Sequence, residues 1–266
     1  MMMTTIFTIV AFATATPTAD VSDSIVAFGD SWAWLGYNQF RDVFSAHNMT
    51  TSLRAIPGTP AAYWALIEPN ALVDAVDKAG ANAVYLSIGG NDYLEGLPLG
   101  HAVELLHVEM IKSTRVMLDR LFEERPHVQV FHFGYELLNW DSCLLCKAFG
   151  ATELKGRGPH LCPDTTNVTC MTTAQATWLQ RKYIDEGLAD VYKDNPNYHG
   201  LNLLGTLQVA GGVAGASVGR PVMSEYSPEQ YVRKATGSWS CVHLTKAGYT
   251  ALYHELAKHV VPHLSQ

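Results

Sequence analysis

The stretch SIVAFGDS, at Ser24–Ser31, decides the fold of this chain. Its apolar part, Ser24–Phe28, is typical of a buried β-strand, and the Gly29-Asp30 pair after it is typical of a tight turn. Ser31 follows at the start of a segment with a helical pattern. A serine at the end of a strand stands where an α/β enzyme would hold a nucleophile, because ligand sites lie at the carboxyl ends of parallel strands.

Short apolar runs alternate with longer helical stretches along the rest of the chain. The expected strands are Ser24–Phe28, Thr51–Ile56, Ala83–Ile88, Val128–Gly134 and Leu201–Leu204. The expected helices are Leu35–His47, Ala61–Ala79 (broken at Pro69), Gly100–Glu124, Thr172–Asp194 and Lys246–His259. This alternation predicts an α/β fold, a three-layer α/β/α sandwich with a central parallel sheet. Residues 205–240 are expected to be irregular.

Three further short motifs follow Ser31 in the order in which they occur in a known family: IPGT with Gly58, GGND with Asn91 and CVHL with His243. The chain resembles the SGNH (GDSL-type) hydrolases, whose name lists Ser, Gly, Asn and His. The resemblance runs from about Ile25 to the last helix. It implies the flavodoxin-like sandwich of that family, in agreement with the strand and helix pattern.

The resemblance also implies a serine esterase that hydrolyses carboxylic esters through an acyl-enzyme, with no metal or other cofactor. Ser31 would be the nucleophile and His243 its base. The oxyanion hole would comprise the backbone N–H of Ser31, together with Gly58 and Asn91. Each residue also has a purely structural interpretation: a helix-capping serine, a Pro-Gly turn, a turn asparagine and a surface histidine. Asp30 and Asp92 are expected to brace their loops through backbone hydrogen bonds.

One position departs from the family pattern. Family members with a full triad carry aspartate three residues before the histidine, where this chain has Ser240. The imidazole would then lack the carboxylate that orients it. Three interpretations stay open: a backbone carbonyl near Ser240 orients His243, Glu225 or Glu229 supplies the carboxylate, or the protein binds esters without turning them over.

Two other functions therefore stand beside hydrolysis: a non-catalytic ester- or carbohydrate-binding protein on the same fold, and an acyltransferase. The expected substrate is a small-molecule ester, an acylated carbohydrate or a lipid. Trp32, Trp34 and Tyr37 follow the nucleophile and either line the cleft or pack the helix against the sheet.

Charge limits the partners. Only 16% of residues are charged, the formal net charge is −7 and no Lys/Arg-rich block occurs. This argues against nucleic acid and anionic membranes, which both attract clustered positive charge. We expect a monomer.

The amino-terminal segment has a composition that sets it apart from the rest of the chain. Met1–Thr16 has no charged side chain, and its apolar run precedes the small-x-small triplet Ala13-Thr14-Ala15. Residues 1–15 are therefore expected to be a signal peptide, which predicts a secreted protein. The run is shorter than the about 20 residues that a membrane span needs. Residues 16–266 are expected to form a single domain with a Cys-rich insertion at about 135–171.

That insertion contains four of the five cysteines: Cys143, Cys146, Cys162 and Cys170. In a secreted chain they are expected to form two disulfides, and three pairings are open. A zinc site that includes His160 is the alternative. Cys241 is left over. Asn48 and Asn167 each begin an N-x-Thr glycosylation sequon, which predicts a glycoprotein if the source has a eukaryotic secretory pathway.

Overall fold

The computed structural model describes residues 23–96, 102–137, 181–225, 227–233 and 243–264. They contain one five-stranded sheet in which every neighbouring pair is parallel, in the order β2-β1-β3-β4-β5. The strands are β1 (Ser24–Gly29), β2 (Thr50–Ala55), β3 (Ala83–Ser87), β4 (Gln129–His132) and β5 (Tyr198–Gly200). The predicted fold class is confirmed.

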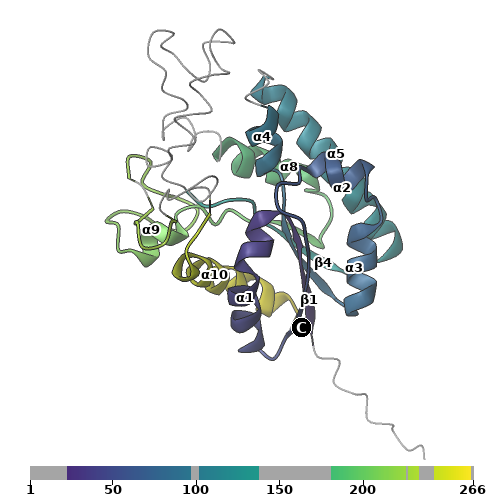
Figure 1. The fold of residues 1–266 in the computed structure, drawn as a ribbon, viewed down its shortest axis with the longest axis horizontal. Coiled ribbons are helices and arrows are strands. Elements are labelled where there is room, and N and C mark those ends of the chain that lie inside the picture. Colours follow the sequence, from purple (N-terminus) through teal and green to yellow (C-terminus); the bar gives the residue numbers. More distant parts are fainter. Residues whose placement is uncertain (1–22, 97–101, 138–180, 226, 234–242, 265–266) are drawn as a thin grey trace, which may run out of the picture.

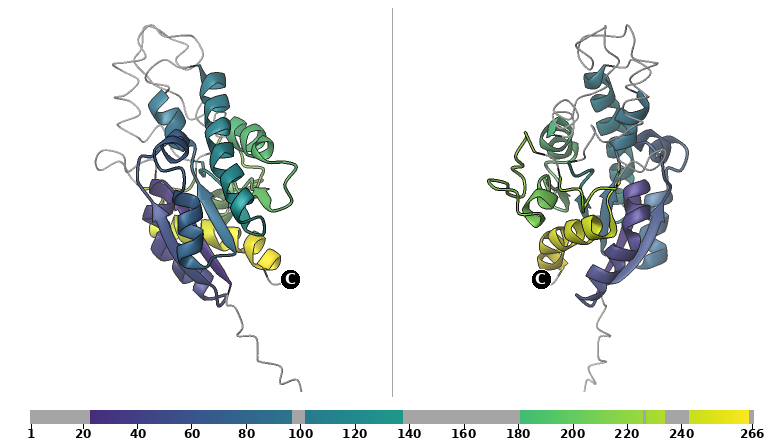
Figure 2. Two further views of the ribbon diagram at one scale, coloured as in Figure 1. Left: turned by 90° about the vertical axis from the view of Figure 1, so that its right-hand side faces the viewer. Right: turned by 60° about the vertical axis from the view of Figure 1, so that its left-hand side comes forward.

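Helices cover both faces of this sheet (Figures 1 and 2). On one face α1 (Ser31–Ser45) packs against α10 (Lys246–Leu264), next to the short α9 (Thr206–Ala210). The other face carries α2 (Ala61–Leu66), α3 (Ala71–Ala79), α4 (Gly90–Gly96), α5 (Val103–Glu124), the π-helix η2 (Tyr183–Leu188) and α8 (Ala189–Val191). The predicted break near Pro69 separates α2 from α3.

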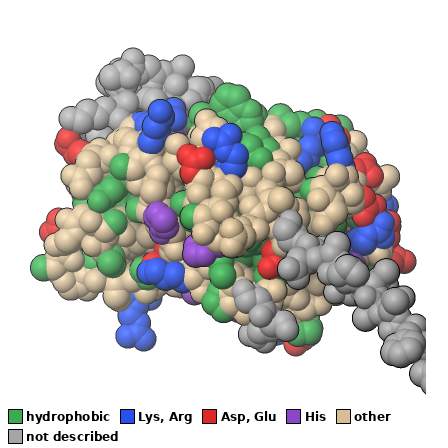
Figure 3. Space-filling model, turned by 90° about the horizontal axis from the view of Figure 1, so that it is seen from below, with side chains coloured by type: hydrophobic (Ala, Val, Ile, Leu, Met, Phe, Trp, Pro, Cys, Tyr) green, Lys and Arg blue, Asp and Glu red, His purple; other side chains and the backbone are tan. Residues whose placement is uncertain are grey.

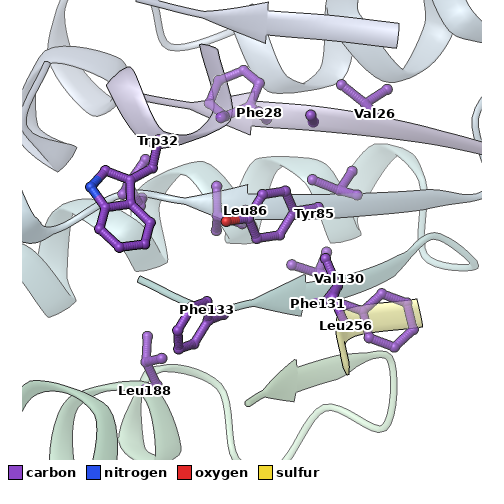
Figure 4. Packing of buried hydrophobic residues seen from close by; sticks show 14 of the residues in the cluster. Val26, Phe28, Trp32, Tyr85, Leu86, Val130, Phe131, Phe133, Leu188 and Leu256 are labelled. Atoms are coloured by element: carbon purple, nitrogen blue, oxygen red, sulfur yellow. The ribbon is translucent and has the colours of Figure 1, made fainter. Parts of the chain in front are cut away.

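Apolar side chains from both faces of the central strands form the core. All six residues of β1 and all five of β3 are buried, as expected for parallel strands covered on both sides. Figure 4 shows strand side chains together with Trp32 of α1, Leu188 of η2 and Leu256 of α10. Burying each large apolar side chain contributes about 1.5–3 kcal/mol. The edge strand β2 is only partly buried, which suits its polar sequence TTSLRA.

The register aligns the carboxyl ends of the central strands. Gly29 pairs with Ala55 on β2 and with Ser87 on β3, so these strands end at the same level. Two backbone bonds continue the alignment into the loops: Asp30 N donates to Ser87 O at 3.0 Å, and Ile56 N donates to Gly29 O at 2.9 Å. The segments after β1, β2 and β3 therefore leave the sheet side by side.

The last strand lies earlier than predicted. The expectation of a strand at Leu201–Leu204 is wrong, because pairing with β4 ends at Gly200. Leu203 and Leu204 are nevertheless buried, in an irregular segment before Gly205, which has a φ of +86°. The apolar run Leu201–Leu204 thus indicates burial and not strand pairing. The expected irregular stretch after it contains α9.

None of the helices in the described residues is long and apolar enough to cross a membrane. On the face shown in Figure 3, basic and acidic side chains are interspersed. The predicted signal peptide at residues 1–15 and the cysteines of the insertion lie outside the described residues.

Candidate active site

A tight turn places Ser31 at the carboxyl edge of the sheet. Gly29 has a φ of +141°, and a Cβ there would lie 1.9 Å from Ser87 O, so the turn requires glycine. Asp30 is the N-cap of α1, and its Oδ1 accepts a hydrogen bond from Trp32 N at 3.0 Å. Ser31 is consequently fixed as the first residue of the helix, half-buried at the strand end.

His243 reaches this serine from the other end of the chain. Its Nε2 lies 2.8 Å from Ser31 Oγ, and the residue is only 8% exposed. The segment before α10 is anchored to a neighbouring one: Arg233 N donates to His243 O at 3.0 Å, and Val232 forms an isolated β-bridge with Leu244. The pair has the distance that a serine nucleophile and its base require.

What orients the His243 imidazole through its other ring nitrogen is still known only as a prediction from the sequence. Ser240 and Cys241 lie outside the described residues. The alternative carboxylates, Glu225 and Glu229, are both exposed, in contrast to the buried imidazole. The three interpretations of the missing aspartate therefore stay open.

Asn91 lies in the first turn of α4 and holds two loops together. Its Nδ2 donates to Asp30 Oδ2 at 3.1 Å and to Thr59 O at 3.2 Å. Both amide hydrogens of this buried side chain are therefore engaged. The resemblance alone suggested a donor ready for an oxyanion, whereas the structure shows a donor that must first release an internal acceptor.

Gly58 lies in the exposed turn after β2 and has a φ of +81°. This turn belongs to the same edge as Ser31, because Ile56 N bonds to Gly29 O at 2.9 Å and Thr59 O bonds to Asn91 Nδ2 at 3.2 Å. Among the hydrogen bonds of the described residues, none uses the backbone N–H of Ser31 or Gly58. These two N–H groups can donate to a new acceptor without first losing a hydrogen bond.

Asp30 is fully buried and has four donors around its carboxylate. Oδ1 accepts from Trp32 N at 3.0 Å and from Ser87 Oγ at 3.4 Å, while Oδ2 accepts from Asn91 Nδ2 at 3.1 Å and from the hydroxyl of Tyr135. Burial raises the pKa of Asp30 to about 6, and these hydrogen bonds oppose the rise. The expectation that Asp30 braces its loop is confirmed, and its contacts extend to β3, α4 and the segment after β4.

Asp92 also braces its loop, as expected. Its Oδ2 accepts a hydrogen bond from Ala61 N at 2.9 Å, at the start of α2. This bond satisfies one of the free N–H groups at the helix end. Asp92 thus connects α4 to the segment that carries Gly58.

The three aromatic residues of α1 have different surroundings. Trp32 is fully buried, with its ring edge-on to Tyr135 at 4.8 Å and to Tyr249 at 5.9 Å between centroids. Tyr37 donates from its hydroxyl to Thr51 O at 3.1 Å on the edge strand. Trp34 is 52% exposed. Packing accounts for Trp32 and Tyr37, and only Trp34 presents a ring to solvent near Ser31.

Sequence reasoning missed two buried polar residues, Tyr135 and Glu136, because it assigned them to the irregular insertion. Glu136 accepts hydrogen bonds from Leu137 N and Gly205 N at 2.7 Å each and from Leu207 N at 3.2 Å. It thereby fixes the start of α9. Their position directly after the predicted strand Val128–Gly134, on the same edge as Ser31, was the available signal.

Among the described residues, no group of three or more His, Cys, Asp and Glu side chains is arranged to hold a metal ion. Cys143, Cys146, His160, Cys162 and Cys170 lie outside these residues, so both the disulfides and the zinc alternative stay predictions. Asn167 lies outside as well. Asn48 is exposed and lies two residues before β2.

No protein-family model and no curated protein matches the sequence. Solved structures do match. The lipopolysaccharide acetyltransferase periplasmic domain of Salmonella ser. Paratyphi A is 12% identical with a TM-score of 0.53, over 90% of this chain and 84% of that one. A carbohydrate esterase family 3 protein from Talaromyces cellulolyticus is 12% identical with a TM-score of 0.51, over 91% and 98%.

An acetyl xylan esterase, AlAXEase, is 11% identical with a TM-score of 0.50, over 89% of this chain and 99% of that one. Identities this low bear on the fold alone. The chain has the three-layer α/β/α fold of the SGNH-type esterases.

Proposed function

We propose that this protein is a serine esterase of the SGNH type, which hydrolyses carboxylic esters through an acyl-enzyme. The observation that carries the proposal is the 2.8 Å contact between Ser31 Oγ and His243 Nε2 at the carboxyl edge of the sheet. A hydroxyl is a weak nucleophile at neutral pH, and an imidazole within hydrogen-bond distance can take its proton as it attacks.

In the first half of the reaction, Ser31 Oγ bonds to the ester carbonyl carbon while its proton passes to His243 Nε2. The carbonyl oxygen becomes negatively charged and is stabilised by N–H donors. The tetrahedral intermediate then breaks its bond to the alkoxy oxygen, which leaves as an alcohol with the proton from His243. Ser31 keeps the acyl group as an ester.

Water completes the cycle. His243 takes a proton from the water as its oxygen attacks the acyl carbon, and the bond to Ser31 Oγ then breaks. The serine oxygen recovers the proton from His243, and the carboxylic acid leaves. No step requires a metal or an organic cofactor.

The proposed oxyanion donors differ in readiness. The N–H groups of Ser31 and Gly58 make no hydrogen bond among the described residues and can serve directly. Asn91 must exchange one acceptor, and Thr59 O is the one that we expect it to release. A neutral carbonyl is a weaker acceptor than either the Asp30 carboxylate or a developing oxyanion. Asp30 would thus keep the amide in place during the exchange.

The proposed substrate is a small-molecule ester, and an acylated carbohydrate is the first choice within this class. Trp34 supports it, because an exposed indole one helical turn from the nucleophile can stack on a sugar ring or an apolar acyl chain. Side chains in a helix tilt toward its N-terminus, which directs this ring toward Ser31. The likeness to a carbohydrate esterase and an acetyl xylan esterase adds support at the level of fold.

Acyl transfer is the second candidate, since one structural neighbour is an acetyltransferase domain. The same acyl-enzyme would serve, with a sugar hydroxyl in place of water. We further propose that the protein is exported, on the basis of the expected signal peptide at residues 1–15 and the clustered cysteines.

The test is release of p-nitrophenol from acetate, butyrate and longer esters, with and without a serine-reactive phosphonate. An esterase releases it, and the phosphonate stops the reaction by labelling Ser31. Faster release on addition of a sugar acceptor, with formation of acylated sugar, would favour transfer. Carbohydrate binding without turnover or labelling would instead point to the non-catalytic alternative.

A further inference from the structure

Tyr135 follows β4 and reaches the centre of the candidate site. Its hydroxyl donates to Asp30 Oδ2, and its ring packs edge-on against Trp32 at 4.8 Å between centroids. A Cβ on Gly90 would lie 1.9 Å from the Tyr135 ring, so the ring presses against the turn that leads into Asn91. Tyr135 therefore contacts both the turn before the nucleophile and the turn before the candidate oxyanion residue.

The shared partner of these turns is the Asp30 carboxylate. Oδ2 receives both the Tyr135 hydroxyl and Asn91 Nδ2, the latter at 3.1 Å. Asp30 and Tyr135 are both buried, so water does not substitute for either bond. The orientation of the Asn91 amide thus depends on a carboxylate that the tyrosine holds from the opposite side.

We propose that Tyr135 is a positioning residue for the oxyanion site: through Asp30, its hydroxyl fixes the amide of Asn91 in the orientation that catalysis uses. The part of this proposal that concerns catalysis rests on the proposed esterase function. The part that concerns the coupling of Tyr135, Asp30 and Asn91 does not.

The ionisation of Asp30 explains why a hydroxyl would matter here. A carboxylate can accept from all four donors, whereas a protonated carboxyl has one oxygen that must itself donate. Burial raises the pKa of Asp30 to about 6, and the hydrogen bond from Tyr135 is the largest influence that lowers it. Without this hydroxyl the pKa rises further, and the carboxyl becomes protonated closer to neutral pH.

Other titratable groups face this carboxylate from the surrounding elements. They are Tyr85 of β3, Tyr183 of η2, and Tyr249 and Tyr253 of α10, with Asp92 of α4 and the His243 imidazole nearby. Burial raises the pKa of each of these four tyrosines, so they stay neutral at the pH values of interest. Among the hydrogen bonds of the described residues, the Asp30 carboxylate accepts from the Tyr135 hydroxyl and from none of these four.

Replacing Tyr135 with phenylalanine separates the hydroxyl from the ring. The ring contacts with Trp32 and Gly90 are kept, and only the bond to Asp30 is lost. The matched control is Tyr192→Phe, which removes another tyrosine-to-aspartate bond, that of Tyr192 to Asp119. Tyr192 precedes β5 and so lies at the amino ends of the strands, opposite to the candidate site at their carboxyl ends.

We expect Tyr135→Phe to lower kcat for p-nitrophenyl acetate about tenfold or more and to change KM less than about twofold. Its acidic limb in the kcat–pH profile should move to higher pH. Tyr192→Phe should match the wild type in all three quantities. A Tyr135→Phe protein that keeps the kcat and acidic limb of the wild type would overturn the positioning role.

An NMR titration tests the coupling without any turnover, and its first arm measures the wild-type protein. In the wild type, the Asn91 side-chain amide signals should shift with the same midpoint as the Asp30 carboxyl ¹³C signal, assigned with Asp30→Asn. In Tyr135→Phe both midpoints should move to higher pH. Asn91 amide signals whose chemical shifts do not change as Asp30 titrates would refute the coupling. If the wild type instead hydrolyses no ester but shows the coupling, the proposed function fails and the Tyr135–Asp30–Asn91 link stands.

Discussion

Ser31 and His243 are 212 residues apart in the sequence, yet Oγ of one lies 2.8 Å from Nε2 of the other. The sheet brings Ser31 to its carboxyl edge, and the bridge between Val232 and Leu244 fixes the histidine segment beside it. A contact over such a sequence distance exists only in the folded chain. It is therefore the relationship on which activity should depend most directly.

Ser31→Ala should abolish ester turnover and phosphonate labelling, because it removes the atom that forms the acyl-enzyme. The half-buried side chain loses one oxygen, so the fold should persist by circular dichroism and thermal unfolding. Ser45→Ala is the matched control: it removes an exposed hydroxyl at the other end of α1. A folded Ser31→Ala protein with undiminished turnover would exclude the serine mechanism.

Asn91→Ala should lower kcat by about 10²–10³, or ~2.7–4 kcal/mol, with a much smaller change in KM. Asn91→Asp should be worse in kcat and stability, since it places a second carboxylate 3.1 Å from Asp30 Oδ2, where the amide nitrogen lies now. Steady-state kinetics and urea unfolding measure both effects. A raised KM with an unchanged kcat would assign Asn91 to ground-state binding.

Trp34→Ala should raise KM for acetylated oligosaccharides about tenfold and leave kcat for p-nitrophenyl acetate within about twofold. Trp34 is 52% exposed, so removal of its side chain should cost little stability, unlike removal of the fully buried Trp32 side chain. Trp34→Phe should restore part of the affinity because it keeps an aromatic face. Equal KM values for the wild type and the alanine variant on every ester would remove Trp34 from the binding site.

The parts of this molecule that sequence could predict are those with a local signature. The alternation of apolar and helical segments specified the parallel sheet, and Gly29, Asp30 and Ser31 have the residue types that a tight strand-to-helix turn needs. The last strand was misplaced because Leu203 and Leu204 are buried without pairing, and an apolar run alone does not distinguish the two cases.

Tyr135 and Glu136 escaped prediction for a different reason. Their roles depend on partners far away in the sequence: Asp30, at a separation of 105 residues, for Tyr135, and the backbone around Gly205, at 69 residues, for Glu136. No local pattern distinguishes such a residue from one in a loop. The engaged state of Asn91 likewise follows from the positions of Asp30 and Thr59, which only the assembled fold fixes.

Glu136→Gln should lower stability and weaken its dependence on pH. The new amide nitrogen must face a backbone N–H, which leaves a buried donor unpaired at a cost of about 1–3 kcal/mol. Burial raises the pKa of Glu136 from 4.5 to about 7, so the folded protein binds this proton more tightly than the unfolded chain. The contribution of this group to stability is therefore full below about pH 4.5 and is lost as pH rises to about 7.

That loss amounts to about 3 kcal/mol for this group in the wild type and is absent from the glutamine variant. Urea unfolding at several values between pH 4.5 and 8 measures it, with Glu123→Gln as the control for an exposed carboxyl. Identical pH slopes for the wild type and Glu136→Gln would show that Glu136 has the same proton affinity in both states.

Position 240 tests what orients His243. If a backbone carbonyl orients the imidazole, Ser240→Ala should cost less than about tenfold in rate, or ~1.4 kcal/mol. If the Ser240 hydroxyl orients the imidazole, the loss in rate should approach the ~10⁴-fold fall in kcat that follows neutralisation of the triad carboxylate in a serine protease. Ser240→Asp should place a carboxylate near the ring and raise the pKa of the histidine. Because the free base is then lost sooner as pH falls, the acidic limb of kcat/KM should move to higher pH. A limb that stays in place would mean that residue 240 does not face His243, and the orienting group would then have to be sought elsewhere, with Glu225→Gln and Glu229→Gln as the next variants to measure.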